Sequence, residues 1–205
     1  MSDHDHDHEH DEFHNPTDSE IRAKAVESLL AEKGLLSTDA VDEIVDQYEN
    51  NDGPMNGARV VARAWTDPEY KHRLLENGGD AVAELGYGDE HSARLVVVEN
   101  TPRIHNVIVC TLCSCYPWSV LGLPPEWYKS ETYRARVVKE PRVVLSEFGL
   151  ELDDSIEVRV WDSLSELRYM VLPERPEGTD HMTEEELAAL ISRDAMIGVA
   201  KAGNG

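Results

Sequence analysis

Apolar side chains recur every three or four residues over the first part of the chain, after a polar start. This period is typical of amphipathic helices, so we expect several helices in succession. Thr17 and Glu20 have the spacing of a capping box, and Gly34 is expected to end the first helix. The Asn-Gly-Gly segment at 77–79 is expected to end the last. The predicted helices cover residues 17–34, 38–48, 57–65 and 68–76.

The pattern changes near residue 86, where short runs rich in Val and Ile begin. Such runs, bounded by turn residues, predict β-strands. Helices are expected at 130–148, with Pro141 as an interruption, and from Thr183 to about residue 193, where Glu186 completes another capping box. The predicted strands cover residues 94–99, 104–109, 156–161, 168–172 and 196–200.

These elements predict an α+β fold in three segments. Residues 1–16 alternate His with acidic residues and hold almost no large apolar side chain, so we expect a disordered tail. Residues 17–85 form a helical N-terminal arm, and residues 86–205 form a mixed α/β core. The strand predicted at 104–109 leads directly into the most unusual segment of the chain.

The charge of the chain excludes some partners. The 205 residues include 41 acidic residues against 19 Lys and Arg, which gives a formal net charge of −22. Nucleic acids and anionic membranes attract basic surfaces, so neither is expected as a partner. No apolar run approaches the roughly 18 residues of a spanning helix, and the N-terminus lacks the features of a signal peptide. We therefore expect a cytoplasmic protein.

All three cysteines of the chain lie within six residues, at Cys110, Cys113 and Cys115. A disulfide scaffold needs an even number spread along the chain, so this odd cluster indicates metal or redox chemistry. Thiolates prefer soft or borderline metals. A structural zinc site would need a fourth ligand, for which His105 and His91 are candidates.

The Cys-Ser-Cys segment at 113–115 permits a second kind of site. If the backbone amides of Ser114 and Cys115 lose their protons, their nitrogens and the sulfurs of Cys113 and Cys115 form fused chelate rings in one plane. Cys110 can then occupy an axial position and leave one position open for water. Such strongly donating anionic ligands suit a trivalent low-spin ion, which would acidify that water.

The segment at 110–118, Cys-Thr-Leu-Cys-Ser-Cys-Tyr-Pro-Trp, resembles the metal-binding loop of the nitrile hydratase α subunit. Four further segments resemble other blocks of the same family, and together they extend over most of the chain. These are residues 57–70, 121–129, 133–138 and 175–179. The resemblance implies a non-corrin Co(III) site or a non-haem Fe(III) site, and Thr111 is similar to the cobalt class.

The resemblance also implies roles for individual residues. Cys110 stays a thiolate, whereas Cys113 becomes a sulfinic acid and Cys115 a sulfenic acid, which are successive stages of thiol oxidation. These three sulfurs and the amides of Ser114 and Cys115 hold the metal. Further residues at or behind the active site are Trp118, Asp162, Arg168 and His91.

The family works with a β subunit, which supplies arginines to the oxidised cysteines, so the expected unit is αβ or α2β2. The resemblance implies a small nitrile as substrate, an amide as product, and a metallochaperone that loads the metal. Two alternatives remain open. Thiocyanate hydrolase has a similar metal-bearing subunit, in which Arg stands in place of Trp118. A non-catalytic metal-trafficking protein could use the thiols and the five tail histidines, His4, His6, His8, His10 and His14.

Overall fold

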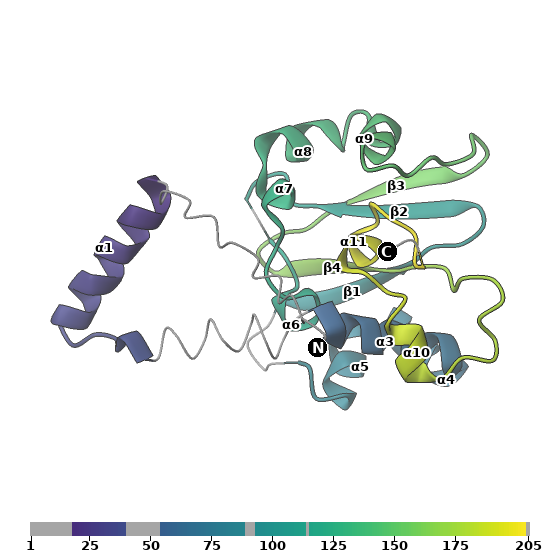
Figure 1. Cartoon of the computed structure of the whole chain (residues 1–205), viewed down its shortest axis with the longest axis horizontal. Helices are drawn as coiled ribbons and strands as arrows, with labels where there is room; N and C mark the ends of the chain where they lie inside the picture. Colours follow the sequence, from purple (N-terminus) through teal and green to yellow (C-terminus); the bar gives the residue numbers. More distant parts are fainter. Residues whose placement is uncertain (1–17, 40–53, 89–92, 114, 204–205) are drawn as a thin grey trace, which may run out of the picture. The chain divides into compact units, whose positions relative to one another are not determined.

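The computed structural model describes residues 18–39, 54–88, 93–113 and 115–203 (Figure 1). Contacts divide the chain into two compact units, one up to Val45 and one from Asp46 onward. The expected tail at 1–16, the Thr17 cap and most of the helix expected at 38–48 lie outside the described residues. The three-segment division remains a prediction.

In the first unit, the structure describes the helix α1 (Asp18–Glu32) in full. Gly34 follows it with a φ of 68°, a left-handed conformation that favours glycine. The backbone N–H of Leu35 then donates to the carbonyl oxygen of Leu30 at 3.0 Å, which closes the helix end. The predicted end of this helix is therefore confirmed.

The second unit begins with α3 (Pro54–Thr66), α4 (Pro68–Glu76) and α5 (Gly78–Glu84). Asp67 caps α4, because its carboxylate accepts the backbone N–H groups of Glu69 and Tyr70 at 3.0 Å. The 77–79 segment ends α4 as predicted, but a new helix starts there, which the turn-like sequence pattern does not indicate. Asn77 causes this, because its side-chain oxygen accepts the N–H of Asp80 and so caps α5.

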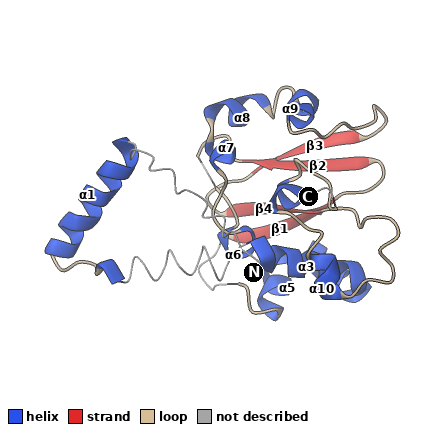
Figure 2. Cartoon of the chain, viewed as in Figure 1, coloured by secondary structure: helices blue, strands red, loops and turns tan. Residues whose placement is uncertain are grey.

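The strands within the described ranges form two parallel pairs (Figure 2). They are β1 (Arg94–Glu99), β2 (Ile104–Val109), β3 (Glu157–Asp162) and β4 (Leu167–Leu172), within one residue of the predicted bounds. Although β1 and β2 are neighbours in sequence, β1 pairs with β4 and β2 pairs with β3. The last pair of the β2–β3 register is Val109 with Asp162. This register brings Asp162 to the start of the cysteine segment.

Short helices make up most of the rest of the second unit. The predicted helix at 130–148 is two helices, because Pro141 starts the second one rather than interrupting a single one. The Thr183–Glu186 capping box is confirmed, but its helix ends earlier than expected. The helices are α6 (Trp118–Leu121), α7 (Glu126–Lys129), α8 (Glu131–Arg136), α9 (Pro141–Glu147), α10 (Glu184–Ala188) and α11 (Arg193–Ile197).

The strand predicted at 196–200 is wrong, because this segment contains the end of α11. Gly198 ends the helix with a φ of 95°. A Cβ at Gly198 would lie 2.0 Å from the carbonyl oxygen of Asn106, so only glycine fits against β2 here. An apolar run of this length is compatible with either a strand or a short helix, and tertiary packing decides.

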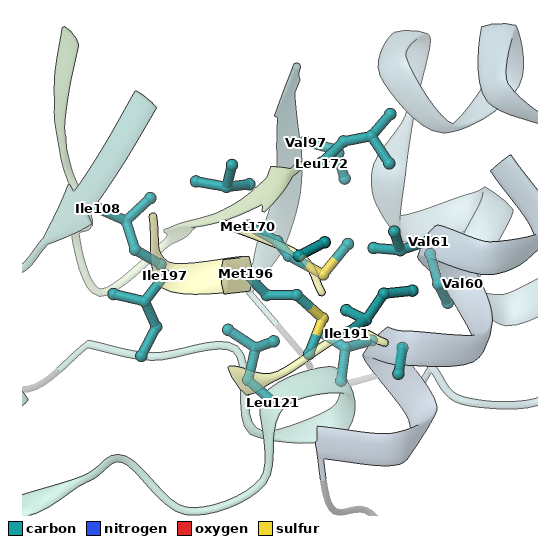
Figure 3. Packing of buried hydrophobic residues seen from close by; sticks show 14 of the residues in the cluster. Val60, Val61, Val97, Ile108, Leu121, Met170, Leu172, Ile191, Met196 and Ile197 are labelled. Carbon is teal, nitrogen blue, oxygen red and sulfur yellow. The ribbon is translucent and has the colours of Figure 1, made fainter. Parts of the chain in front are cut away.

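The core joins helices and strands from distant parts of the second unit (Figure 3). Val60 and Val61 of α3, Met170 of β4 and Met196 of α11 are buried members of this one apolar cluster. The mixed helix-and-strand architecture confirms the predicted fold class. Among the described residues, no helix is long and apolar enough to cross a membrane.

Candidate metal centre

The cysteine segment leaves the end of β2 and brings its three sulfurs together. All three Sγ atoms lie within 4.8 Å of one another. The Sγ atom of Cys113 lies 3.5 Å from that of Cys110 and 3.1 Å from that of Cys115. Cys110 and Cys115 are buried, whereas Cys113 is exposed. The three thiols predicted to share a metal therefore converge on one point at the protein surface.

Backbone geometry supports this convergence. The backbone N–H of Cys113 donates to the Sγ of Cys110 at 3.3 Å, which closes a tight turn over the buried sulfur. A chain that turns this tightly can present several sulfurs to one ion. Ser114 lies outside the described residues, so its expected amide ligand remains a prediction.

Asp162, at the end of β3, holds the start of the loop. Its carboxylate accepts the backbone N–H of Thr111 at 2.9 Å and the hydroxyl of the same residue at 2.6 Å. The parallel β2–β3 register makes this contact possible, because it places Asp162 opposite Val109. The structure thus brings Asp162 to the loop and shows which groups it touches, and its expected role at the active site remains a prediction.

The electrostatic surroundings of Cys115 involve Arg168. Burial and hydrogen bonding to the other two sulfurs raise the pKa of the Cys115 thiol to about 12, whereas the positive charge of Arg168 acts to lower this pKa. The Nη1 atom of Arg168 is buried and has no hydrogen-bond partner among the described residues. A buried hydrogen-bond donor normally has an acceptor, so the unpartnered Nη1 of Arg168 suits a site to which acceptor atoms are added by later modification. Sulfur-bound oxygens on the neighbouring cysteines would be such acceptors.

Trp118 begins α6, three residues beyond Cys115, and its side chain is 42% exposed. A large aromatic side chain with this exposure next to the loop is available to contact a substrate. His91 lies outside the described residues, so its expected place at the site remains a prediction.

Of the two histidines that could supply the fourth ligand of a structural zinc site, His105 does not face the thiols. His105 is buried, with its Nε2 atom 2.7 Å from the carbonyl oxygen of Gly198 and its Nδ1 atom 3.3 Å from the side-chain nitrogen of Asn100. Both ring nitrogens are therefore engaged away from the thiols. Among the described residues, the group able to hold a metal consists of the three cysteines alone.

Two tyrosines that no sequence motif marks as functional flank the loop. The hydroxyl of Tyr133 donates to the carbonyl oxygen of Ile108 in β2 at 2.7 Å. The hydroxyl of Tyr128 donates to the carbonyl oxygen of Cys115 at 3.0 Å. Both tyrosines lie in segments that resemble the family, but no sequence pattern indicates where a hydroxyl group points.

Comparisons with known proteins agree with the geometry. The sequence model of the family described as "Nitrile hydratase, alpha chain" matches residues 17–200. The α subunit of the low-molecular-weight cobalt-containing nitrile hydratase of Rhodococcus rhodochrous is 57% identical over 87% of this chain and 86% of its own length. A solved structure of a double mutant of the Fe-type nitrile hydratase from Comamonas testosteroni Ni1 superposes with a TM-score of 0.86. It is 45% identical and covers 91% of this chain and 92% of its own. The γ subunit of thiocyanate hydrolase from Thiobacillus thioparus is 45% identical over 90% of this chain and 80% of its own length.

Proposed function

The chain belongs to the nitrile hydratase α-chain family, and we propose from this premise that Cys110, Cys113 and Cys115 hold the cobalt centre at which a nitrile is hydrated. The chain is thus the α subunit of a hydro-lyase that converts a nitrile and water into an amide. The amide nitrogens of Ser114 and Cys115 complete the proposed ligand set. The observation that carries the proposal is the convergence of three sulfurs within 4.8 Å at the end of β2.

The residues of the loop fit such a metal. Three soft sulfur donors from one short segment suit cobalt or iron better than magnesium or calcium. When bound, the trivalent ion supplies Lewis acidity toward the nitrile and toward water. Cobalt is favoured over iron by Thr111 and by the 57% identity to a cobalt-containing relative, against 45% to the iron-type structure.

Around the ion, this chain supplies the positioning groups. Asp162 fixes Thr111, so the loop starts from a defined position. Arg168 supplies positive charge beside Cys115 and a buried donor for the oxygens of the proposed sulfinic and sulfenic groups. A charged donor stabilises such anionic oxygens more strongly than a neutral one would.

Substrate contact is proposed for Trp118 and His91. The exposed ring of Trp118 offers an apolar wall for the organic part of a nitrile and displaces water from it. His91 is proposed to line the same pocket because, in the family resemblance, it stands where some members have a Gln near the active site.

An α subunit works with a partner chain, here a β subunit. We propose an αβ or α2β2 assembly in which β-subunit arginines complete the pocket, a metallochaperone that loads the metal, and a cytoplasmic location. The exposed positions of Cys113 and Trp118 support a shared pocket, because a second chain must cover them to exclude bulk water.

The test is to express the chain together with a nitrile hydratase β subunit in cobalt medium and to assay acrylonitrile and thiocyanate in parallel. We expect amide formation from the nitrile and little turnover of thiocyanate, since Trp118 stands where thiocyanate hydrolase has Arg. Preferential thiocyanate hydrolysis would instead support that second function, which the 45% identity to the thiocyanate hydrolase subunit makes a specific alternative.

A further inference from the structure

Tyr128 connects α7 to the far end of the metal loop. Its hydroxyl donates to the backbone carbonyl oxygen of Cys115 at 3.0 Å, and its side chain is fully buried. The loop is therefore held at both ends, by Asp162 at Thr111 and by Tyr128 at Cys115.

The ring of Tyr128 is fixed by other aromatic side chains. Its centroid lies 5.1 Å from that of Tyr116, 5.9 Å from that of Tyr133 and 6.0 Å from that of Trp127. Rings packed at these separations restrict one another to a narrow range of orientations.

The carbonyl oxygen that Tyr128 contacts belongs to Cys115, the ligand whose geometry the proposed site constrains most. In the proposed site, Cys115 contributes both its sulfur and its amide nitrogen, so a change in its backbone angles alters two metal bonds together. The carbonyl carbon is bonded to the same Cα as the amide nitrogen and the Cβ–Sγ arm, so a hydrogen bond that holds the carbonyl oxygen restricts the movement of this Cα and of both ligand atoms. A fixed donor at this oxygen therefore preorganises two ligands through one hydrogen bond.

We infer that Tyr128 is a positioning residue for the metal centre, whose hydroxyl fixes the Cys115 carbonyl and thereby slows the release of the bound ion. This inference rests on the proposed function, because it assumes that Cys115 is a ligand. The inference predicts that removing the Tyr128 hydroxyl speeds the release of the metal, in addition to any loss of stability of the fold.

Two matched control variants, at Tyr70 and Tyr133, separate the effect on the metal from the effect on the fold. Tyr70 is also buried, and its hydroxyl donates to the backbone carbonyl of Ala81 at 3.0 Å, between α4 and α5. Tyr133 belongs to the same aromatic cluster as Tyr128, but its hydroxyl bonds to Ile108 within β2, ahead of the loop. The variants Tyr128→Phe, Tyr70→Phe and Tyr133→Phe each remove one buried hydroxyl and keep the ring.

The experiment measures three properties of each variant in complex with the β subunit: the melting temperature, the sulfur-to-cobalt charge-transfer spectrum, and the half-time of cobalt release into excess chelator. We expect similar falls in melting temperature for all three. Tyr128→Phe alone should shift the charge-transfer band and shorten the release half-time about tenfold or more, the effect of losing one buried hydrogen bond.

The possible failures are distinguishable. A wild-type complex without bound cobalt would contradict the proposed function itself. Cobalt in the wild-type complex, with Tyr128→Phe matching Tyr70→Phe in spectrum and release, would overturn the inference alone. A Tyr128→Phe chain that fails to fold while Tyr70→Phe folds would also overturn it, because the hydroxyl would then serve the fold and not the metal loop.

Discussion

Thr111 and Asp162 are joined by two hydrogen bonds although they lie 51 residues apart in the sequence. The bonds attach the first residue inside the cysteine segment to the last residue of β3. The position of the metal loop thus depends on a strand register that no local sequence pattern encodes.

Asp162→Ala should loosen the start of the loop, because it removes both acceptors of Thr111. We expect a roughly tenfold faster loss of cobalt to chelator and a comparable fall in activity, the effect of about 1–2 kcal/mol. Asp162→Asn should be milder. Its amide oxygen can still accept the Thr111 N–H, and its amide N–H can donate to the Thr111 hydroxyl oxygen after that hydroxyl rotates.

Asp153 offers a matched control for this variant. Its carboxylate accepts the backbone N–H of Ser155 at 2.8 Å and the hydroxyl of the same residue at 2.6 Å, in a loop before β3. Asp153→Ala should leave the release of cobalt unchanged. Equal effects of the two alanine variants would show that the Asp162 contact has no specific role at the metal.

The ligand set predicts a contrast between side chains and backbone. Cys110→Ala, Cys113→Ala and Cys115→Ala should each abolish activity and most metal retention, because each removes a donor from a closed chelate. Ser114→Ala should retain both, since the proposed ligand is its backbone nitrogen. Metal content by mass spectrometry and the rate of amide formation measure the contrast. Complete metal loss in Ser114→Ala would require a role for its hydroxyl instead.

His105 predicts a pH dependence of stability. Burial lowers the pKa of this imidazole in the folded chain, and the positive charge of Lys201 acts in the same direction. The unfolded chain therefore binds a proton more readily than the folded chain. The stabilisation is complete above the ordinary histidine pKa of about 6.5, and it falls as the pH drops from there through the lowered folded pKa, by at most about 1.4 kcal/mol per pH unit.

The melting temperature of the complex between pH 7.5 and 5 tests this dependence. His105→Gln should flatten the decline, because glutamine does not titrate and can still donate to the Gly198 carbonyl. His72, which is exposed on α4, supplies the control variant His72→Gln, whose profile should match the wild type. If the melting temperatures of wild type and His105→Gln declined in parallel as the pH falls, the assignment of this pH dependence to His105 would be contradicted.

The sequence predicts the local elements of this fold well where one residue pattern decides them. The bounds of β1 and β2 follow from their Val and Ile runs, and the capping box at Thr183 follows from its spacing. The strand expected at 196–200 fails, because the close approach of Gly198 to Asn106 is a tertiary constraint. An apolar pentapeptide carries no information about that approach.

The same distinction applies to the site. The three cysteines lie within six residues, so their convergence is predictable from spacing and is observed. The exclusion of His105 depends on the buried partners Gly198 and Asn100, which only the fold reveals. The contact of Tyr128 with Cys115 likewise depends on how α7 packs, so no pattern of residue types could indicate it.

The central claim is that this loop holds a cobalt ion among oxidised cysteines, and its most direct test is one measurement on the complex purified with the β subunit. Peptide mass spectrometry of the segment containing residues 110–118, combined with metal analysis, should find about one cobalt per αβ pair. It should also find two added oxygens on Cys113, one on Cys115 and none on Cys110. Stoichiometric zinc with three unmodified thiols in an active preparation would contradict the account.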